Sequence, residues 1–326
     1  MRAVVITRPG GPEVLEVHEV PPPRVGEQDV LVRVRAAGLN RADILQRRGG
    51  YAPPSGSPAE IPGLEYAGEI VEVGARVRGH SVGDRVCGIT GGGAHAELIA
   101  VPASTTARAP TRLSWTDAGA IPEAFITAHD ALVTQAQLTR GQRVLIHAVG
   151  SGVGLAAVQV VRAVGAVPFG TSRTADKIDR AREHGLEAGA AITDPAALGN
   201  VVADWAPDGV DVVLDLVGGA YTPASIGVLA SRGRLMLVGL VAGATATFDL
   251  RRILSRRIAV IGTVLRSRSI EEKAIATATF ARDLSAGFEA GRLRAVVDSV
   301  YSLDAIADAH RRMESNESFG KVVIVP

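Results

Sequence analysis

A buried-strand pattern that runs directly into a glycine-rich turn and a helix constrains this chain more than any other feature. The apolar run 144–148 leads into Gly152, Gly154 and Ala157, which match the G-x-G-x-x-G/A spacing of dinucleotide-binding folds. A side chain at Gly154 would stand between the backbone and a pyrophosphate, and the small Ala157 lets the helix approach the sheet. The helix N-terminus offers unpaired N–H groups to phosphates. The residues expected to bind a pyrophosphate are Ser151, Gly152, Val153 and Gly154.

The residues after the next predicted strand, 167–170, indicate which dinucleotide is bound. Folds that use NAD place an Asp or Glu about 20 residues beyond the glycines, where it binds the ribose 2′-hydroxyl. This chain has Ser172 and Arg173 there, followed by Lys177, and its first carboxylate, Asp176, lies inside the next predicted helix. Hydroxyl and cationic groups bind a 2′-phosphate, which a carboxylate would repel. We therefore expect NADPH; the alternative is that these cations only solvate the start of a helix.

Strand and helix patterns divide the chain into a strand-rich part and a part in which strands and helices alternate. Short alternating strands with Gly and Pro turns fill the first third, which is typical of a barrel-like β domain. After about residue 116, helices alternate with short apolar strands, which predicts a parallel sheet with helices on both faces. The strand, helix and strand patterns after residue 295 return to the early style, and we expect this tail to rejoin the first domain. The predicted fold class is α/β, with two domains, as suits 326 residues.

Charge and composition exclude several classes of function. Lys plus Arg (35) nearly balance Asp plus Glu (34), so we expect no strong affinity for nucleic acid or for an anionic membrane. No apolar stretch approaches the roughly 20 residues of a membrane span. The single cysteine, Cys87, excludes an intrachain disulfide and a Cys-rich metal site. We expect a cytosolic protein.

Motifs along nearly the whole chain resemble the zinc-free, zeta-crystallin-like quinone oxidoreductases of the medium-chain dehydrogenase/reductase superfamily, most closely the tumour-suppressor-inducible type. The motifs that carry the resemblance are 38–43 (GLNRAD), 61–65 (IPGLE), 83–86 (GDRV), 121–128 (IPEAFITA), 141–159 and 265–268 (LRSR). The resemblance implies a GroES-like catalytic domain over 1–120, an NADPH-binding Rossmann domain over 121–265, and a C-terminal segment, 266–326, that returns to the catalytic domain. It also implies a cleft between the domains and a homodimer joined near 258–264.

The resemblance bears directly on metal binding. The zinc-dependent alcohol dehydrogenase branch has Cys where this chain has Asn40 and His where it has Leu64. Asn is a poor zinc ligand, Leu is none, and the carboxylate of Glu65 alone cannot make a site. We therefore expect no metal.

The resemblance also implies roles for individual residues. Asn40 and Tyr51 should line the substrate side, with the Tyr51 phenol donating to the acceptor carbonyl; the alternative is that Tyr51 only anchors its loop. Relatives place a Tyr near the 2′-phosphate where this chain has Ile192, which weakens the expected NADPH preference. The remaining residues expected to contact the cofactor are Thr127, Val217, Gly239, Leu240, Leu265, Phe319 and Lys321.

We predict hydride transfer from NADPH to a quinone without a metal, because a quinone is electron-poor and needs no Lewis acid. A reductase of enones, enals or enoyl thioesters would use the same hydride geometry. A non-catalytic protein that retains the cofactor site is a further alternative. The expected partners are a small-molecule quinone or enone and a second copy of the chain.

Overall fold

A six-stranded sheet occupies the middle of the chain in the computed structural model, which describes residues 1–326. Its strand order is β10-β9-β8-β11-β12-β13, and every neighbouring pair is parallel. The strands are β8 (Arg143–Ile146), β9 (Val167–Ser172), β10 (Ala188–Ala191), β11 (Val210–Asp215), β12 (Leu229–Leu237) and β13 (Ala259–Gly262). The order reverses between β8 and β11, so this gap is the switch point at which doubly wound sheets bind ligands. The predicted Rossmann sheet is confirmed.

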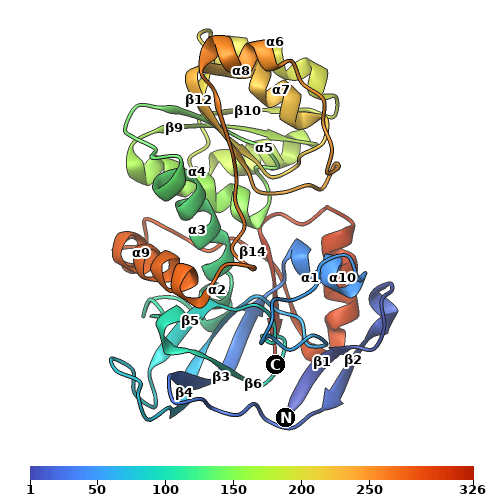
Figure 1. Cartoon of the computed structure of the whole chain (residues 1–326), viewed down its shortest axis with the longest axis vertical. Coiled ribbons are helices and arrows are strands. Elements are labelled where there is room, and N and C mark those ends of the chain that lie inside the picture. Colours follow the sequence, from blue (N-terminus) through green and yellow to red (C-terminus); the bar gives the residue numbers. More distant parts are fainter. The chain divides into compact units, whose positions relative to one another are not determined.

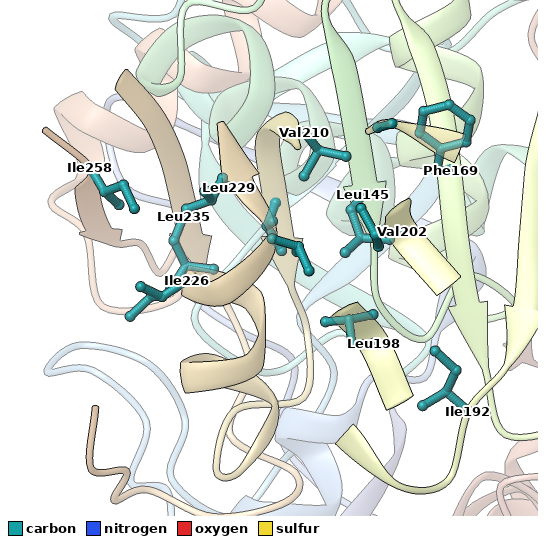
Figure 2. Packing of buried hydrophobic residues seen from close by; sticks show 13 residues of the cluster. Leu145, Phe169, Ile192, Leu198, Val202, Val210, Ile226, Leu229, Leu235 and Ile258 are labelled. Carbon is teal, nitrogen blue, oxygen red and sulfur yellow. The ribbon is translucent and has the colours of Figure 1, made fainter. Parts of the chain in front are cut away.

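Helices precede and connect these strands, and several of them pack against the sheet. They are α3 (Pro122–His129), the π-helix η3 (Asp130–Gln135), α4 (Gly152–Val164), α5 (Ala175–Arg182), the 3-10 helix η4 (Pro195–Ala197), α6 (Leu198–Trp205), α7 (Tyr221–Val228) and α8 (Leu250–Arg256). Figure 2 shows how side chains of α6 and α7, such as Leu198 and Ile226, pack against Leu145 and Leu235 of the strands. Each fully buried Leu of this core stabilises the fold by about 1.5–3 kcal/mol.

A second sheet, mostly antiparallel, is built from both ends of the chain. Its order is β14-β15-β3-β4-β5-β7, with β6 paired to β3. β1 and β2 form a separate antiparallel pair, seen side by side in Figure 1. The strands are β1 (Arg2–Ile6), β2 (Leu15–Glu19), β3 (Asp29–Gly38), β4 (Glu65–Val73), β5 (Arg85–Ile89), β6 (Leu98–Pro102), β7 (Thr106–Arg108), β14 (Val297–Ser302) and β15 (Lys321–Val325). The accompanying helices are η1 (Pro12–Val14), α1 (Arg41–Arg47), η2 (Ala103–Thr105), α2 (Trp115–Gly119), α9 (Ile270–Glu289), η5 (Leu303–Ala305) and α10 (Ile306–Glu314).

The C-terminal tail completes this second sheet. β15 pairs antiparallel with β3, with Val323 opposite Gly38 and Ile324 opposite Ala37. Contacts divide the chain into a first unit, residues 1–126 and 265–326, and a second unit, residues 127–264. The prediction that the tail rejoins the N-terminal β domain is therefore confirmed. None of the helices has the length and apolar character needed to cross a lipid bilayer.

Candidate active site

The glycine-rich turn of the second unit begins with strained backbone. Ala148, two residues after the end of β8, has φ +50°, a left-handed conformation that costs a residue with a Cβ about 1 kcal/mol. Ser151 caps α4, since its hydroxyl accepts a hydrogen bond from the Gly154 amide at 3.1 Å. A Cβ at Gly154 would lie 2.6 Å from the Ala148 carbonyl oxygen. The turn therefore requires glycine at 154 because it packs on its own backbone, in addition to any need to admit a phosphate. Gly152 and Val153 form the first turn of α4.

Close packing behind the turn brings the helix onto the sheet. Ala157 is completely buried, as expected for a small residue that lets α4 approach the strands. A Cβ at Gly170 of β9 would lie 2.9 Å from the Cβ of Val149. Val149 in turn donates its amide to the Thr171 carbonyl at 2.9 Å. These contacts hold the turn at the carboxyl ends of β8 and β9, where a dinucleotide pyrophosphate would meet the start of α4.

The end of β9 carries hydroxyl and cationic groups and no carboxylate. Ser172 is the last residue of the strand and is buried, Arg173 is exposed, and Lys177 lies half-buried in α5. Ile192 packs into the hydrophobic core and is 3% exposed, so its side chain offers nothing to a 2′-phosphate (Figure 2). A hydroxyl and cations at this position could bind an anionic group.

Tyr221, at the start of α7, lies close to Ile192 and Arg173. The sequence did not single it out. Its hydroxyl donates to the Ile192 carbonyl at 3.1 Å. Burial raises the pKa of the Tyr221 phenol, while the nearby charge of Arg173 lowers it and that of Asp194 raises it. The only sequence signal was an aromatic residue two positions after a Gly-Gly pair, which does not point to a site.

Asp215 organises the loop at the switch point of the sheet. One carboxylate oxygen accepts the amides of Val217 and Gly218 at 2.9 and 2.8 Å, and the other accepts the Thr222 hydroxyl at 2.9 Å. The Ala242 amide donates to the Val217 carbonyl at 2.8 Å. The structure thus brings together the loops that hold three residues expected at the cofactor: Val217, Gly239 and Leu240.

His147, at the end of β8, belongs to a buried hydrogen-bond chain. The Ser225 hydroxyl donates to the Tyr221 carbonyl at 2.7 Å, so it accepts from His147 Nε2 at 2.8 Å. His147 Nδ1 then accepts from the Thr171 hydroxyl at 2.7 Å. Burial lowers the pKa of His147 to about 4, with the Asp215 charge opposing that shift. The imidazole is neutral at pH 7 and ties β8 to β9 and α7.

The first unit contains a buried ion pair between Lys321 and Glu65. The Lys321 ammonium lies 2.6 Å from Oε1 of Glu65 and also donates to Asn40 Oδ1 at 2.6 Å and to the Leu39 carbonyl at 2.9 Å. Asn40 Nδ2 donates to Glu65 at 2.9 Å. A Cβ at Gly38 would lie 2.2 Å from this carboxylate, so glycine leaves the space that it occupies. Both ends of the Asn40 amide, and all three ammonium protons, are used within the protein.

Tyr51 is fixed by Arg266, a residue that sequence analysis noted only within a motif. The guanidinium carbon lies 4.8 Å from the centre of the Tyr51 ring, and Nη1 donates to the Tyr51 carbonyl at 3.2 Å. Arg266 also donates to the Gly91 carbonyl at 3.0 Å and to Gln46. Burial raises the pKa of the half-buried Tyr51 phenol, with Arg266 opposing. The loop that holds Tyr51 is therefore anchored by Arg266. Because the pKa of the phenol is raised, its hydroxyl stays protonated at neutral pH and can donate a hydrogen bond.

Glu123, also missed from the sequence, lies beside this ion pair in the first turn of α3. Its amide donates to Oε2 of Glu65 at 2.9 Å. Burial, followed by the charge of Glu65, raises the pKa of the Glu123 carboxyl to about 8. The group is therefore protonated at pH 7. Its sequence signal was a carboxylate after Pro122, which is ordinary at a helix start.

The other expected cofactor contacts are mostly buried. Thr127 lies in α3 and is 9% exposed. Leu265 and Phe319 are also buried, and the Phe319 amide donates to Asp298 at 2.8 Å. No group of three or more His, Cys, Asp or Glu side chains is arranged to hold a metal ion. Burial raises the pKa of the lone thiol, Cys87, to about 12, which keeps it protonated.

Comparison with known proteins agrees with this architecture. Residues 26–111 match the family model of the alcohol dehydrogenase GroES-like domain, and residues 186–324 match that of zinc-binding dehydrogenases. The chain is 31% identical over 328 residues to a quinone oxidoreductase of Lama guanicoe, covering all of this chain and 97% of that protein. The chain belongs to the medium-chain dehydrogenase/reductase superfamily.

Solved structures of this superfamily are similar over the full length. One is an NAD-dependent alcohol dehydrogenase, with 30% identity, a TM-score of 0.89 and complete coverage of both chains. Another is a mycobacterial protein complexed with NADPH, with 29% identity, a TM-score of 0.88 and complete coverage of both chains. As a medium-chain dehydrogenase/reductase, the protein is an oxidoreductase that uses a nicotinamide cofactor.

Proposed function

We propose that this protein is an NADPH-dependent reductase that transfers hydride to a quinone without a metal. The observation that carries the proposal is the ion pair of Lys321 and Glu65 together with Asn40. The Lys321 ammonium occupies the space between the Glu65 and Asn40 side-chain oxygens, where a metal ion would otherwise have to bind. A metal ion that acts as a Lewis acid is needed most for poor electrophiles such as simple ketones. An electron-poor quinone accepts hydride without one.

The second unit supplies residues that fit NADPH. Ser151, Gly152, Val153 and Gly154 would hold the pyrophosphate, and Arg173 with Lys177 would meet the 2′-phosphate. The bound cofactor would supply a hydride. Asp215 and its loop would orient the nicotinamide end through Val217, because the carboxylate fixes two consecutive amides of that loop.

The first unit supplies the groups for the acceptor. The Tyr51 hydroxyl is the donor that we propose for the acceptor carbonyl, since Arg266 holds its ring in place. Asn40 would shape the site rather than donate, because its amide already has partners at both ends.

We further propose a cytosolic homodimer formed through β13. This strand ends the sheet, so one side of its backbone has no neighbouring strand. Val260 and Val264 are 42% and 46% exposed beside that edge. An exposed apolar edge strand is a template for pairing with another chain, and a second copy would cover it.

A panel assay tests the proposed activity. NADPH oxidation is followed with quinones, enones, enals and enoyl thioesters, and NADPH binding is measured in parallel by calorimetry. We expect turnover of quinones. Turnover of enones or thioesters with no quinone reduction would replace the proposal with the related reductase activity, which uses the same hydride geometry. Tight NADPH binding without oxidation by any acceptor would indicate a non-catalytic binding protein.

A further inference from the structure

Two glutamates, Glu65 and Glu123, are neighbours in the first unit but differ in their surroundings. Glu65 is fully buried and ion-paired to Lys321 at 2.6 Å. Glu123 receives no such pairing, although its own backbone amide is bound to Glu65 at 2.9 Å. Glu123 as a whole residue is partly buried. Adjacent carboxyl groups whose environments separate their protonation states are typical of acid–base sites.

Charged groups from every neighbouring element act on Glu123. Glu65 of β4 and Asp43 of α1 raise the pKa of its carboxyl in addition to burial, whereas Lys321 of β15 and Lys273 of α9 lower it. The result is a pKa of about 8. The Glu123 charge in turn acts on the ionisation of Tyr51 and Arg266, which places it among the residues proposed for the acceptor.

We propose that the Glu123 carboxyl donates the proton that completes reduction of the acceptor. This inference rests on the proposed reductase function. Hydride from NADPH brings two electrons to the quinone and leaves NADP⁺ and a hydroquinone monoanion. The O–H bond of Glu123 breaks, its proton forms the second hydroquinone O–H bond, and the resulting carboxylate takes a proton from water. For an enone, the same proton would go to the enolate.

The other candidate donors in this cluster are less suited to the step. The three protons of Lys321 are held by Leu39, Asn40 and Glu65, so donation would break the buried ion pair. Burial raises the pKa of the Tyr51 phenol above its ordinary value near 10, so it is a weaker acid than Glu123. Tyr51 can donate a hydrogen bond while Glu123 transfers the proton.

The test compares Glu123→Gln with two further variants and a control in the complete protein. Gln keeps the size of the side chain and removes the acidic proton. Glu123→Asp keeps an acid and shows whether function returns if the amide disturbs folding. Tyr51→Phe tests the competing donor. Glu271→Gln is the matched control, because Glu271 is an exposed carboxylate in the first turn of α9. Circular dichroism verifies that each variant is folded.

We expect Glu123→Gln to lower kcat about 100-fold, in the range of general acid catalysis, with KM changed by less than about twofold. In the wild type, kcat should fall above pH 8 as Glu123 ionises, and Glu123→Gln should lose that limb. Glu123→Asp should keep a limb and an intermediate rate. Glu271→Gln should match the wild type in rate and in pH profile.

Infrared titration gives a readout that does not depend on turnover. The wild type without cofactor should show a protonated carboxyl C=O band at pH 7 that disappears around pH 8 and is missing in Glu123→Gln. An ionised Glu123 at pH 7, a Glu123→Gln variant with wild-type kcat or pH limb, or loss of that limb in Tyr51→Phe alone would each overturn the inference. A wild type that reduces no acceptor would overturn the proposed function, and this inference with it.

Discussion

The Lys321 ammonium and the Glu65 carboxylate form an ion pair at 2.6 Å in which the side chains are 7% and 0% exposed. β15 carries the lysine and the start of β4 carries the carboxylate, and both strands pair with β3. The pair therefore forms only when the C-terminal strand has joined the N-terminal sheet. It couples folding of the tail to the arrangement of the residues proposed to contact the acceptor.

Removing one partner of this pair should destabilise the protein strongly. Lys321→Met leaves the Glu65 carboxylate buried without its cation, and such a change costs about 3–5 kcal/mol. We expect a clear fall in the Tm of the first unit, measured by calorimetry. The double variant Lys321→Met with Glu65→Gln should recover much of the loss, because no charge is then left unpaired. Equal stability of the single variant and the wild type would contradict this account.

Cofactor preference should depend on Arg173. Arg173→Ala removes one charge-assisted contact to a 2′-phosphate, worth about 1.5–3 kcal/mol, so NADPH should bind about 10- to 100-fold more weakly. NADH has no 2′-phosphate, and its affinity should change little. Calorimetry with both cofactors measures the difference. Arg180→Ala, an exposed position on the helix that follows, α5, is the control and should leave both affinities unchanged. Equal weakening of both cofactors would assign Arg173 a structural role.

Acid should weaken the second unit through His147. The pKa of this buried imidazole is about 4 in the folded protein, against about 6.5 when unfolded, so the unfolded chain binds more protons below pH 6.5. The stabilising effect of a neutral His147 is complete above pH 6.5 and is lost progressively toward pH 4. Urea unfolding of the wild type and of His147→Gln at several pH values measures the effect. The difference between the two curves should shrink over that range, and a constant difference would contradict the prediction.

The proposed dimer predicts a specific effect at the edge of the sheet. Val260→Lys places a charge on β13, and charged residues on edge strands oppose pairing with another chain. Light scattering after size exclusion should show a dimer for the wild type and a monomer for the variant. Val82→Lys is the control, because Val82 is 65% exposed in a turn of the first unit. A wild-type monomer at micromolar concentration would contradict the proposal.

Sequence patterns predict the elements whose signals are local. The strand, turn and helix around Gly152–Ala157 were predicted within about two residues of the observed bounds, because burial, glycine spacing and capping act over one continuous segment. β10 has the sequence Ala-Gly-Ala-Ala, which favours no strand, and its pairing with β9 alone makes it one. β12 begins at Leu229, ahead of the regular pairing of Arg234 with Val212, because Leu229 pairs with Val210 through an irregular register.

The dinucleotide turn and the cations after β9 could be read from local sequence, and the resemblance to a known family marked Asn40 and Leu64 as replacements for two zinc ligands. The contact of Lys321 with Asn40, 281 positions away in the chain, and the raised pKa of Glu123 beside Glu65 became visible in the folded structure alone. The reason is physical. A residue's charge state and hydrogen-bond partners depend on burial and on groups brought close by strand pairing, and neither is written in the neighbouring sequence.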